Sequence, residues 1–190
     1  MRTSGSSLRH DPVSMPGARR AFAAHPIAAL LATGFGSGLS PLAPGTAGSL
    51  VGLALAWLFV RFVESVHPAA GSLTRTVGLL MSGLAVGALG VAVSGPICRV
   101  LEAKDPGCIV IDEIAGQLIA CSAVPFLLSS GVREAPAWIA PFLLFRLLDV
   151  WKPGPIARLQ NLPGGWGVVA DDLAAGAGAA AVLVLALAVR

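Results

Sequence analysis

Five stretches of mostly apolar residues recur along the chain, separated by short segments rich in Gly, Pro and charged residues. They are Ser49–Val66, Thr76–Ile97, Ile109–Ser129, Ala137–Val150 and Asp172–Val189. A helix that crosses a bilayer needs about 20 such residues. The fourth stretch is shorter, but Trp138 and Trp151 at its ends are typical of anchors at the membrane interface. A further apolar run, Ile27–Thr33, is too short to span and is predicted to lie on or dip into the membrane.

The composition supports a membrane protein. Of the 190 residues, 55% are hydrophobic and 12% are charged, with a mean hydropathy of +0.80. Soluble domains carry roughly 25% charged residues, so this chain has too few to cover a water-facing surface. We predict an all-α, membrane-embedded bundle of four to five transmembrane helices over residues 26–190. Residues 1–25, with four Arg among Ser, Pro and Gly, are predicted to be a disordered basic cytoplasmic tail.

The charges between the apolar stretches predict an orientation. The thirteen Lys and Arg are scattered and form no basic face, which argues against a nucleic-acid partner. Two loops carry pairs of basic residues, Arg99 with Lys104 and Lys152 with Arg158. By the positive-inside rule, these loops and the N-terminus lie in the cytoplasm. The starts of the first, third and fifth stretches and the end of the fourth then share the cytoplasmic face.

Unusual polar residues gather at those four places. They are Asp105, Asp112 and Glu113 around the start of the third stretch, Arg146, Asp149 and Lys152 at the end of the fourth, and Asp171 and Asp172 at the start of the fifth. A carboxylate at membrane depth is costly unless it is paired, so it suggests a functional site. Structural roles are the alternative: helix capping for Asp105 or the Asp171–Asp172 pair, and an i,i+3 ion pair between Arg146 and Asp149.

Before the first stretch stands the segment Thr33–Ser49, which ends in Gly45-Thr46-Ala47-Gly48-Ser49. A Gly-rich segment that enters a helix offers backbone amides and hydroxyls to an anion. We predict that Gly45, Thr46, Gly48 and Ser49 bind a phosphate together with Arg146 and Lys152, whose charges neutralise phosphate oxygens.

Magnesium binds through carboxylates together with substrate phosphate. The predicted Mg²⁺ ligands are Asp112, Glu113, Asp149, Asp171 and Asp172, with Asp105 as a further candidate. The pattern therefore indicates a metal-assisted phosphoryl site at a membrane surface. Other phosphate chemistries fit less well, because Gly48 is followed by Ser49 and Leu50 rather than Lys-Ser/Thr, and the three His residues lie outside the polar set.

Three sequence blocks resemble the phosphatidylglycerophosphatase A family. They are TGFGSGLSPLAPGTAGS (Thr33–Ser49), DPGCIVIDE (Asp105–Glu113), and FRLLDVWKPGPI (Phe145–Ile156) followed by GGWGVVADD (Gly164–Asp172). The resemblance extends from about Leu30 to the C-terminus. It implies a magnesium-dependent lipid phosphatase of the bacterial cytoplasmic (inner) membrane. Such an enzyme removes the terminal phosphate of phosphatidylglycerophosphate and leaves phosphatidylglycerol.

The predicted mechanism requires no covalent intermediate, in agreement with the missing His and Cys signatures. The predicted catalytic residues are Asp112, Glu113, Asp149 and Asp172, with Glu113 or Asp172 accepting the proton of an attacking water. A transporter or channel is the alternative, although transporters place their carboxylates near the bilayer midplane. Lipid phosphotransfer is a third reading, but the Asp-Gly-x2-Ala-Arg signature expected for it is absent. The oligomeric state is left open.

Overall fold

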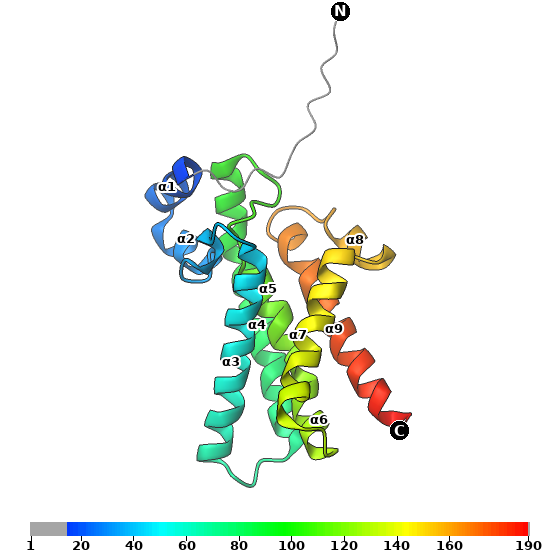
Figure 1. Cartoon of the computed structure of the whole chain (residues 1–190). Coiled ribbons are helices and arrows are strands. Elements are labelled where there is room, and N and C mark those ends of the chain that lie inside the picture. Colours follow the sequence, from blue (N-terminus) through cyan, green and yellow to red (C-terminus); the bar gives the residue numbers. More distant parts are fainter. Residues whose placement is uncertain (1–14, 190) are drawn as a thin grey trace, which may run out of the picture.

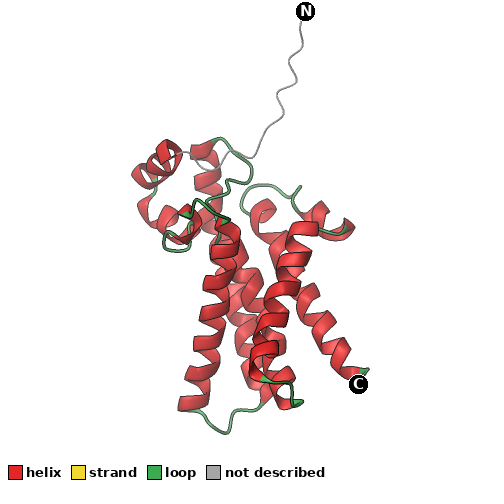
Figure 2. Ribbon diagram, viewed as in Figure 1, coloured by secondary structure: helices red, strands yellow, loops and turns green. Residues whose placement is uncertain are grey.

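The computed structural model describes residues 15–189, and this part of the chain folds into helices joined by loops, without a strand (Figures 1 and 2). In chain order the elements are α1 (Met15–Ala24), α2 (Pro26–Ala32), η1 (Ser37–Leu39), α3 (Pro44–Val66), α4 (Ser72–Leu101), α5 (Ile111–Ala120), η2 (Cys121–Ala123), α6 (Val124–Ser129), α7 (Glu134–Trp151), α8 (Gly154–Leu159) and α9 (Trp166–Ala188). The predicted all-α bundle is confirmed.

Within residues 15–189, four helical segments are long and apolar enough to cross a membrane: Pro44–Val66, Ser72–Leu101, Ile111–Ser129 and Trp166–Ala188. They correspond to the first, second, third and fifth predicted stretches. The fourth stretch forms α7, whose 18 residues include Glu134, Arg146 and Asp149. At a rise of about 1.5 Å per residue α7 extends roughly 27 Å, close to the thickness of a bilayer core.

The structure refines two of the predicted helices. The third stretch contains a single 3₁₀ turn, η2, which separates α5 from α6 just before Pro125. The fifth helix begins at Trp166 rather than at Asp172, so Asp171 and Asp172 lie in its second turn. They therefore do not cap α9.

The last part of the predicted N-terminal tail is helical in the structure. Met15–Ala24 form helix α1, and the buried side chains of Ala18 and Ala21 face the bundle. Residues 1–14 lie outside the described part of the chain, so the predicted disorder there stays a prediction. The apolar run that follows forms the short helix α2, which packs with α1 against α4 at one end of the bundle (Figure 1).

Helix α5 occupies the centre of the bundle. Nine of its ten residues are buried, and only Glu113 is partly exposed. Helices α3, α4, α7 and α9 all contact it, and Figure 1 shows it behind α3 and α7. The first turn of α5, which carries Asp112 and Glu113, is therefore surrounded by the helices that carry the other predicted site residues.

The two ends of the bundle differ in their charges. At one end, Lys104 Nζ lies 3.5 Å from Asn161 Oδ1, so the loop after α4 meets the segment that follows α8. Arg158 lies in the last turn of α8, next to this segment. These basic segments share one end, as the orientation argument requires.

At the opposite end an ion-pair network ties three helices together. Glu64 of α3 pairs with Arg61 at 2.8 Å and with Arg75 of α4 at 2.9 Å. Arg61 also forms an ion pair with Glu134 at the start of α7. This network fixes the end of α7 to α3 and α4, far from the predicted site.

Candidate active site

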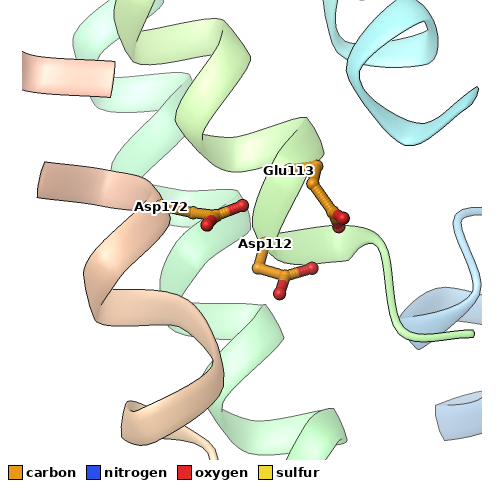
Figure 3. A group of neighbouring side chains, drawn as sticks. All are labelled: Asp112, Glu113 and Asp172. Carbon is orange, nitrogen blue, oxygen red and sulfur yellow. The ribbon is translucent and has the colours of Figure 1, made fainter. Parts of the chain in front are cut away.

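Three carboxylates from two helices meet at the end of the bundle that carries the basic segments. Asp112 and Glu113 extend from the first turn of α5, and Asp172 reaches toward them from α9 (Figure 3). One oxygen of each carboxylate lies within 4.8 Å of the others. Asp112 and Asp172 are 6% and 3% exposed, which is very low for charged groups.

The backbone partly explains why α5 tolerates acids at this place. The free N–H groups in the first turn of a helix carry partial positive charge, so Asp112 and Glu113 occupy a favourable position. That effect is typically below 1 kcal/mol, which is far too small to offset the burial of several neighbouring carboxylates. A further positive charge is required for all of them to be ionised.

Glycines set the distance between α5 and α9. A Cβ atom on Gly176 of α9 would collide with the carbonyl oxygen of Gly116 in α5. A Cβ atom on Gly116 would lie 2.6 Å from the backbone oxygen of Asp172 and 2.5 Å from the ring of Phe145. Small residues allow helix backbones to approach closely inside membranes. This close approach places Asp172 beside Asp112, one turn from the glycine contact.

Two further carboxylates are paired with the cations of α7. Arg146 Nη1 donates to Asp149 Oδ2 at 2.7 Å, as the i,i+3 spacing suggested. Lys152 Nζ lies 2.5 Å from Asp171 Oδ2 and 3.7 Å from Asp149 Oδ1. The two cations therefore link α7 to α9 and stand beside the three-carboxylate cluster.

Lys152 is held in an unusual backbone conformation. It ends α7 with φ of 45°, in the left-handed region that costs a residue other than Gly about 1–2 kcal/mol. Burial lowers the pKa of Lys152, but the hydrogen bond to Asp171 and the charges of Asp171, Asp172 and Asp149 raise it more. The net pKa lies above its ordinary value, so the side chain stays a cation.

The residues predicted to bind phosphate lie in the N-terminal turns of α3, and the part of the segment before Pro44 forms turns, η1 and a loop. Ala43, with φ of 51°, precedes the helix, and Pro44 is its first residue. The amide of Ala47 donates to Ala43 O at 3.1 Å, whereas the amides of Gly45 and Thr46 precede the first intrahelical bond. A Cβ atom on Gly45 would meet the Glu113 carboxylate and lie 3.3 Å from Arg146 Nη1, so this turn faces the carboxylates.

The other residues of that segment differ in their surroundings. The Ser49 hydroxyl donates to Gly45 O at 2.9 Å and accepts from Arg146 Nη1 at 3.4 Å, so it positions the guanidinium. The half-buried Thr46 hydroxyl bonds no other described residue. Gly48 packs against Val110, where a Cβ atom would lie 2.7 Å from Val110 Cβ. Its observed role is helix packing.

The donor set fits a hard divalent cation. Four buried carboxylate oxygens have no hydrogen-bond partner among the described residues: Asp112 Oδ1, Glu113 Oε2, Asp171 Oδ1 and Asp172 Oδ2. Among residues 15–189, the ion pairs of these five carboxylates involve Arg146 and Lys152, which leaves an excess of three negative charges when all are ionised. All of these unpaired atoms are carboxylate oxygens, the ligand atoms that Mg²⁺ and Ca²⁺ prefer.

The structure thus brings together the predicted site positions except Gly48, which packs against Val110, and Asp105. Asp105 lies exposed in the loop between α4 and α5, and the N-cap of α5 is Val110, so Asp105 does not cap that helix. The contact between Gly116 and Gly176 was not predicted. The sequence did contain a sign of this contact, because both glycines are small residues within apolar stretches, a pattern typical of close helix contacts.

Comparison with known proteins identifies relatives over most of the chain. A model of the phosphatidylglycerophosphatase A family matches residues 30–187. Phosphatidylglycerophosphatase A of Escherichia coli (strain K12) is 35% identical over 156 residues, which cover 81% of this chain and 80% of the relative. Phosphatidylglycerophosphatase A of Haemophilus influenzae is 35% identical over 148 residues, or 77% and 80% of the two chains.

A third relative bears a different name. A Bacteroides thetaiotaomicron protein named "Putative phosphatidylinositol-3-phosphatase" is 35% identical over 154 residues, covering 77% of this chain and 85% of its own. No solved structure matches the chain.

Proposed function

The chain belongs to the phosphatidylglycerophosphatase A family, and from this premise we propose that it hydrolyses the terminal phosphate of phosphatidylglycerophosphate to give phosphatidylglycerol. It is a phosphoric monoester hydrolase. The observation that supports this most directly is the meeting of the three-carboxylate cluster, two of whose members are buried, with Arg146 and Lys152 at one end of a membrane bundle. A transport function lacks comparable support, because these carboxylates lie in the terminal turns of α5 and α9.

We propose that Asp112, Glu113 and Asp172 hold Mg²⁺, with Asp149 and Asp171 completing the site. The support is the set of buried carboxylate oxygens without partners and the excess of negative charge. A bound Mg²⁺ would supply Lewis-acid stabilisation of phosphoryl oxygens and a lowered pKa of bound water. Burial of Asp112 and Asp172 is otherwise unexplained, since an isolated pair of buried carboxylates would not stay ionised.

The residues of α3 and α7 are suited to hold the phosphate. The amides of Gly45 and Thr46 and the Thr46 hydroxyl form a donor group at a helix N-terminus, which favours an anion. Arg146 stands beside Gly45 and is oriented by Ser49 and Asp149. Lys152 adds a second cation, and its fixed backbone and ion pairs keep the ammonium group near the carboxylates.

Proton transfer then falls to one of the carboxylates. A water that attacks phosphorus must lose a proton, and a carboxylate within hydrogen-bond reach accepts it. Glu113 is the partly exposed member of the cluster and lies against Gly45, so it stands between the metal-binding group and the phosphate-binding turn. We assign Glu113 this role, with Asp172 as the alternative base.

The membrane placement follows from the same features. We propose a multi-pass protein of the bacterial cytoplasmic membrane, with the site on the cytoplasmic side. The segments at the site end carry Lys104, Lys152 and Arg158, in agreement with the positive-inside rule. The acyl chains of the substrate then stay in the bilayer while the head group reaches the site.

Phosphate release by the purified protein tests this function. We expect release from phosphatidylglycerophosphate in detergent micelles with Mg²⁺, and loss of release when EDTA removes the metal. Phosphatidylinositol 3-phosphate serves as the comparison substrate, because one relative is named for it. Release from neither lipid would contradict the proposed function, and preferential release from the inositol lipid would reassign the substrate.

Replacing Thr46 with Val should lower kcat/KM roughly ten- to a hundredfold. Val keeps the shape of Thr but removes a hydroxyl that bonds no other described residue, so little stability should be lost. A hydrogen bond to a charged group contributes about 1.5–3 kcal/mol, which corresponds to that range. Thr74→Val, at an exposed position at the other end of the bundle, is the matched control. Unchanged kinetics for Thr46→Val would show that this hydroxyl does not bind the phosphate.

A further inference from the structure

An apolar groove lies on the outer surface of the bundle between α3 and α7. Leu50, Leu53, Ala54 and Trp57 of α3 and Trp138 of α7 line a cavity of about 390 Å³. Leu50 and Trp57 are 50% and 44% exposed, so the groove is open on its outer side. Because α3 is one of the helices long enough to cross the membrane, that open side faces lipid.

One end of the groove adjoins the phosphate-binding turn. Gly45, Ser49, Leu53 and Trp57 follow one another at spacings of four along α3, so they form one stripe on its surface. Gly45 and Ser49 contact the groups of the active site, and Leu53 and Trp57 line the groove. This row is inclined to the helix axis and passes from the polar surroundings of Gly45 and Ser49 to the apolar surroundings of Leu53 and Trp57.

The opposite wall has the same register. Arg146 of α7 bonds Ser49 of α3, and Trp138 lies eight residues before Arg146, just as Trp57 lies eight residues after Ser49. Both helices therefore place a Trp about 12 Å from the Ser49–Arg146 contact. The groove extends from Leu50, which follows Ser49 in the chain, to this pair of Trp residues.

The Trp end of the groove is held in place by the ion pairs at the far end of the bundle. The Arg61 guanidinium lies 5.6 Å from the centroid of the Trp57 ring and pairs with Glu134. Trp138 Nε1 donates to the same Glu134 carboxylate at 3.3 Å. One ion pair thus fixes both rings, and the groove has a rigid apolar end.

We propose that this groove binds one acyl chain of the lipid substrate while the phosphate end is held beside Ser49 and Arg146. The inference rests on the proposed phosphatase function and adds to it a lateral route by which the substrate enters between α3 and α7. The acyl chain of the lipid stays in apolar surroundings on this route, and only the head group moves into the polar site. Leu50 and Leu53 of the groove lie within one helical turn of Ser49, which bonds Arg146, and this closeness favours a substrate chain over an unrelated lipid or a second copy of the protein.

Ala54→Trp, which fills the groove from α3, tests the proposal. The measured quantity is the ratio of kcat/KM for dioleoyl phosphatidylglycerophosphate to kcat/KM for the acyl-free head group, glycerophosphoglycerol phosphate. We expect Ala54→Trp to lower this ratio about tenfold, roughly the effect of losing the burial of two methylene groups. Leu55→Trp, an exposed neighbour outside the groove, is the matched control and should leave the ratio within about twofold of the wild type. An unchanged ratio in Ala54→Trp would overturn the proposal.

Photolabelling separates this inference from the phosphatase function. The probe is phosphatidylglycerophosphate with a diazirine in one acyl chain, and the expected label lies between Leu50 and Trp57 and is lost in Ala54→Trp. Equal labelling by a diazirine phosphatidylcholine would show that the groove is a general lipid surface. Absence of label between Leu50 and Trp57 would show that the substrate's acyl chain does not bind in the groove. Either result overturns the inference. If the wild type releases no phosphate from either substrate, the phosphatase function fails, and the labelling alone still decides whether the groove binds this lipid.

Discussion

Replacing Asp112 with Asn should reduce kcat for phosphate release at least about a thousandfold, which corresponds to about 4 kcal/mol of lost transition-state stabilisation. Asp112 is 6% exposed, belongs to the three-carboxylate cluster and has a buried oxygen without a partner. Asn has the same shape but carries no charge, so the helix and its packing should persist. Excess Mg²⁺ should restore activity only weakly, because the variant lacks one of the carboxylates that bind the ion.

Thermal unfolding provides a second measurement that does not depend on activity. A ligand present at 100 times its Kd stabilises the folded state by about 2.7 kcal/mol, so Mg²⁺ should raise the Tm of the wild type. Asp112→Asn should lose most of this increase. Without Mg²⁺ the variant should be at least as stable as the wild type, because one buried negative charge has been removed from a repulsive cluster.

Glu102→Gln is the matched control for Asp112→Asn. Glu102 is an exposed acid at the end of α4 and lies outside the carboxylate cluster. We expect it to keep both wild-type turnover and the Mg²⁺-dependent rise in Tm. Wild-type turnover in Asp112→Asn would mean that Asp112 is not a ligand, and the metal site would then have to be rebuilt around other residues.

Replacing Arg146 with Lys should lower kcat/KM by about a hundredfold, even though the charge is kept. Arg146 Nη1 contacts Asp149 at 2.7 Å and Ser49 at 3.4 Å, so one guanidinium joins α7 to α3 while it faces Gly45. A Lys ammonium is a point charge without a planar fork and cannot keep these contacts and a bidentate contact to phosphate.

The kinetic pattern distinguishes a phosphate-binding role from a structural one. If Arg146 binds the phosphate, kcat/KM for Arg146→Lys falls while its Mg²⁺-dependent rise in Tm stays near the wild-type value. If Arg146 serves only to join the helices, stability falls and the kinetics follow the folded fraction. Arg133→Lys, exposed at the other end of α7, is the control and should be silent in both assays.

Hydropathy predicted the helices well because the bilayer imposes a minimum length on any apolar segment. It predicted their ends less well, and α9 is the clearest example. The segment before Asp172 contains Gly164, Gly165 and Gly167, which suggests a turn. In the structure Gly165 lies against the backbone of Val91 and Gly167 against that of Leu162, so these glycines serve close packing and α9 starts earlier.

The composition of the site could be predicted, but its geometry could not. Burial cost marked Asp112 and Asp172 as unusual, and the orientation rule placed them on one membrane face. Neither argument says which helices touch. The contact between Gly116 and Gly176 determines that α5 and α9 are neighbours, and it depends on the three-dimensional fit of two backbones. The groove was missed for the same reason, because Trp57 and Trp138 are far apart in the sequence.

The central place of α5 has a consequence for how the protein is made. Of the four long helices that enclose α5, two precede it in the chain, α3 and α4, and two follow it, α7 and α9. During synthesis Asp112 and Glu113 therefore emerge before Arg146, Lys152 and the glycines of α9 exist. Until those helices arrive, two acids lack the surroundings that stabilise them in lipid, and such groups oppose insertion. The active site is therefore completed only when the last helix, α9, joins the bundle.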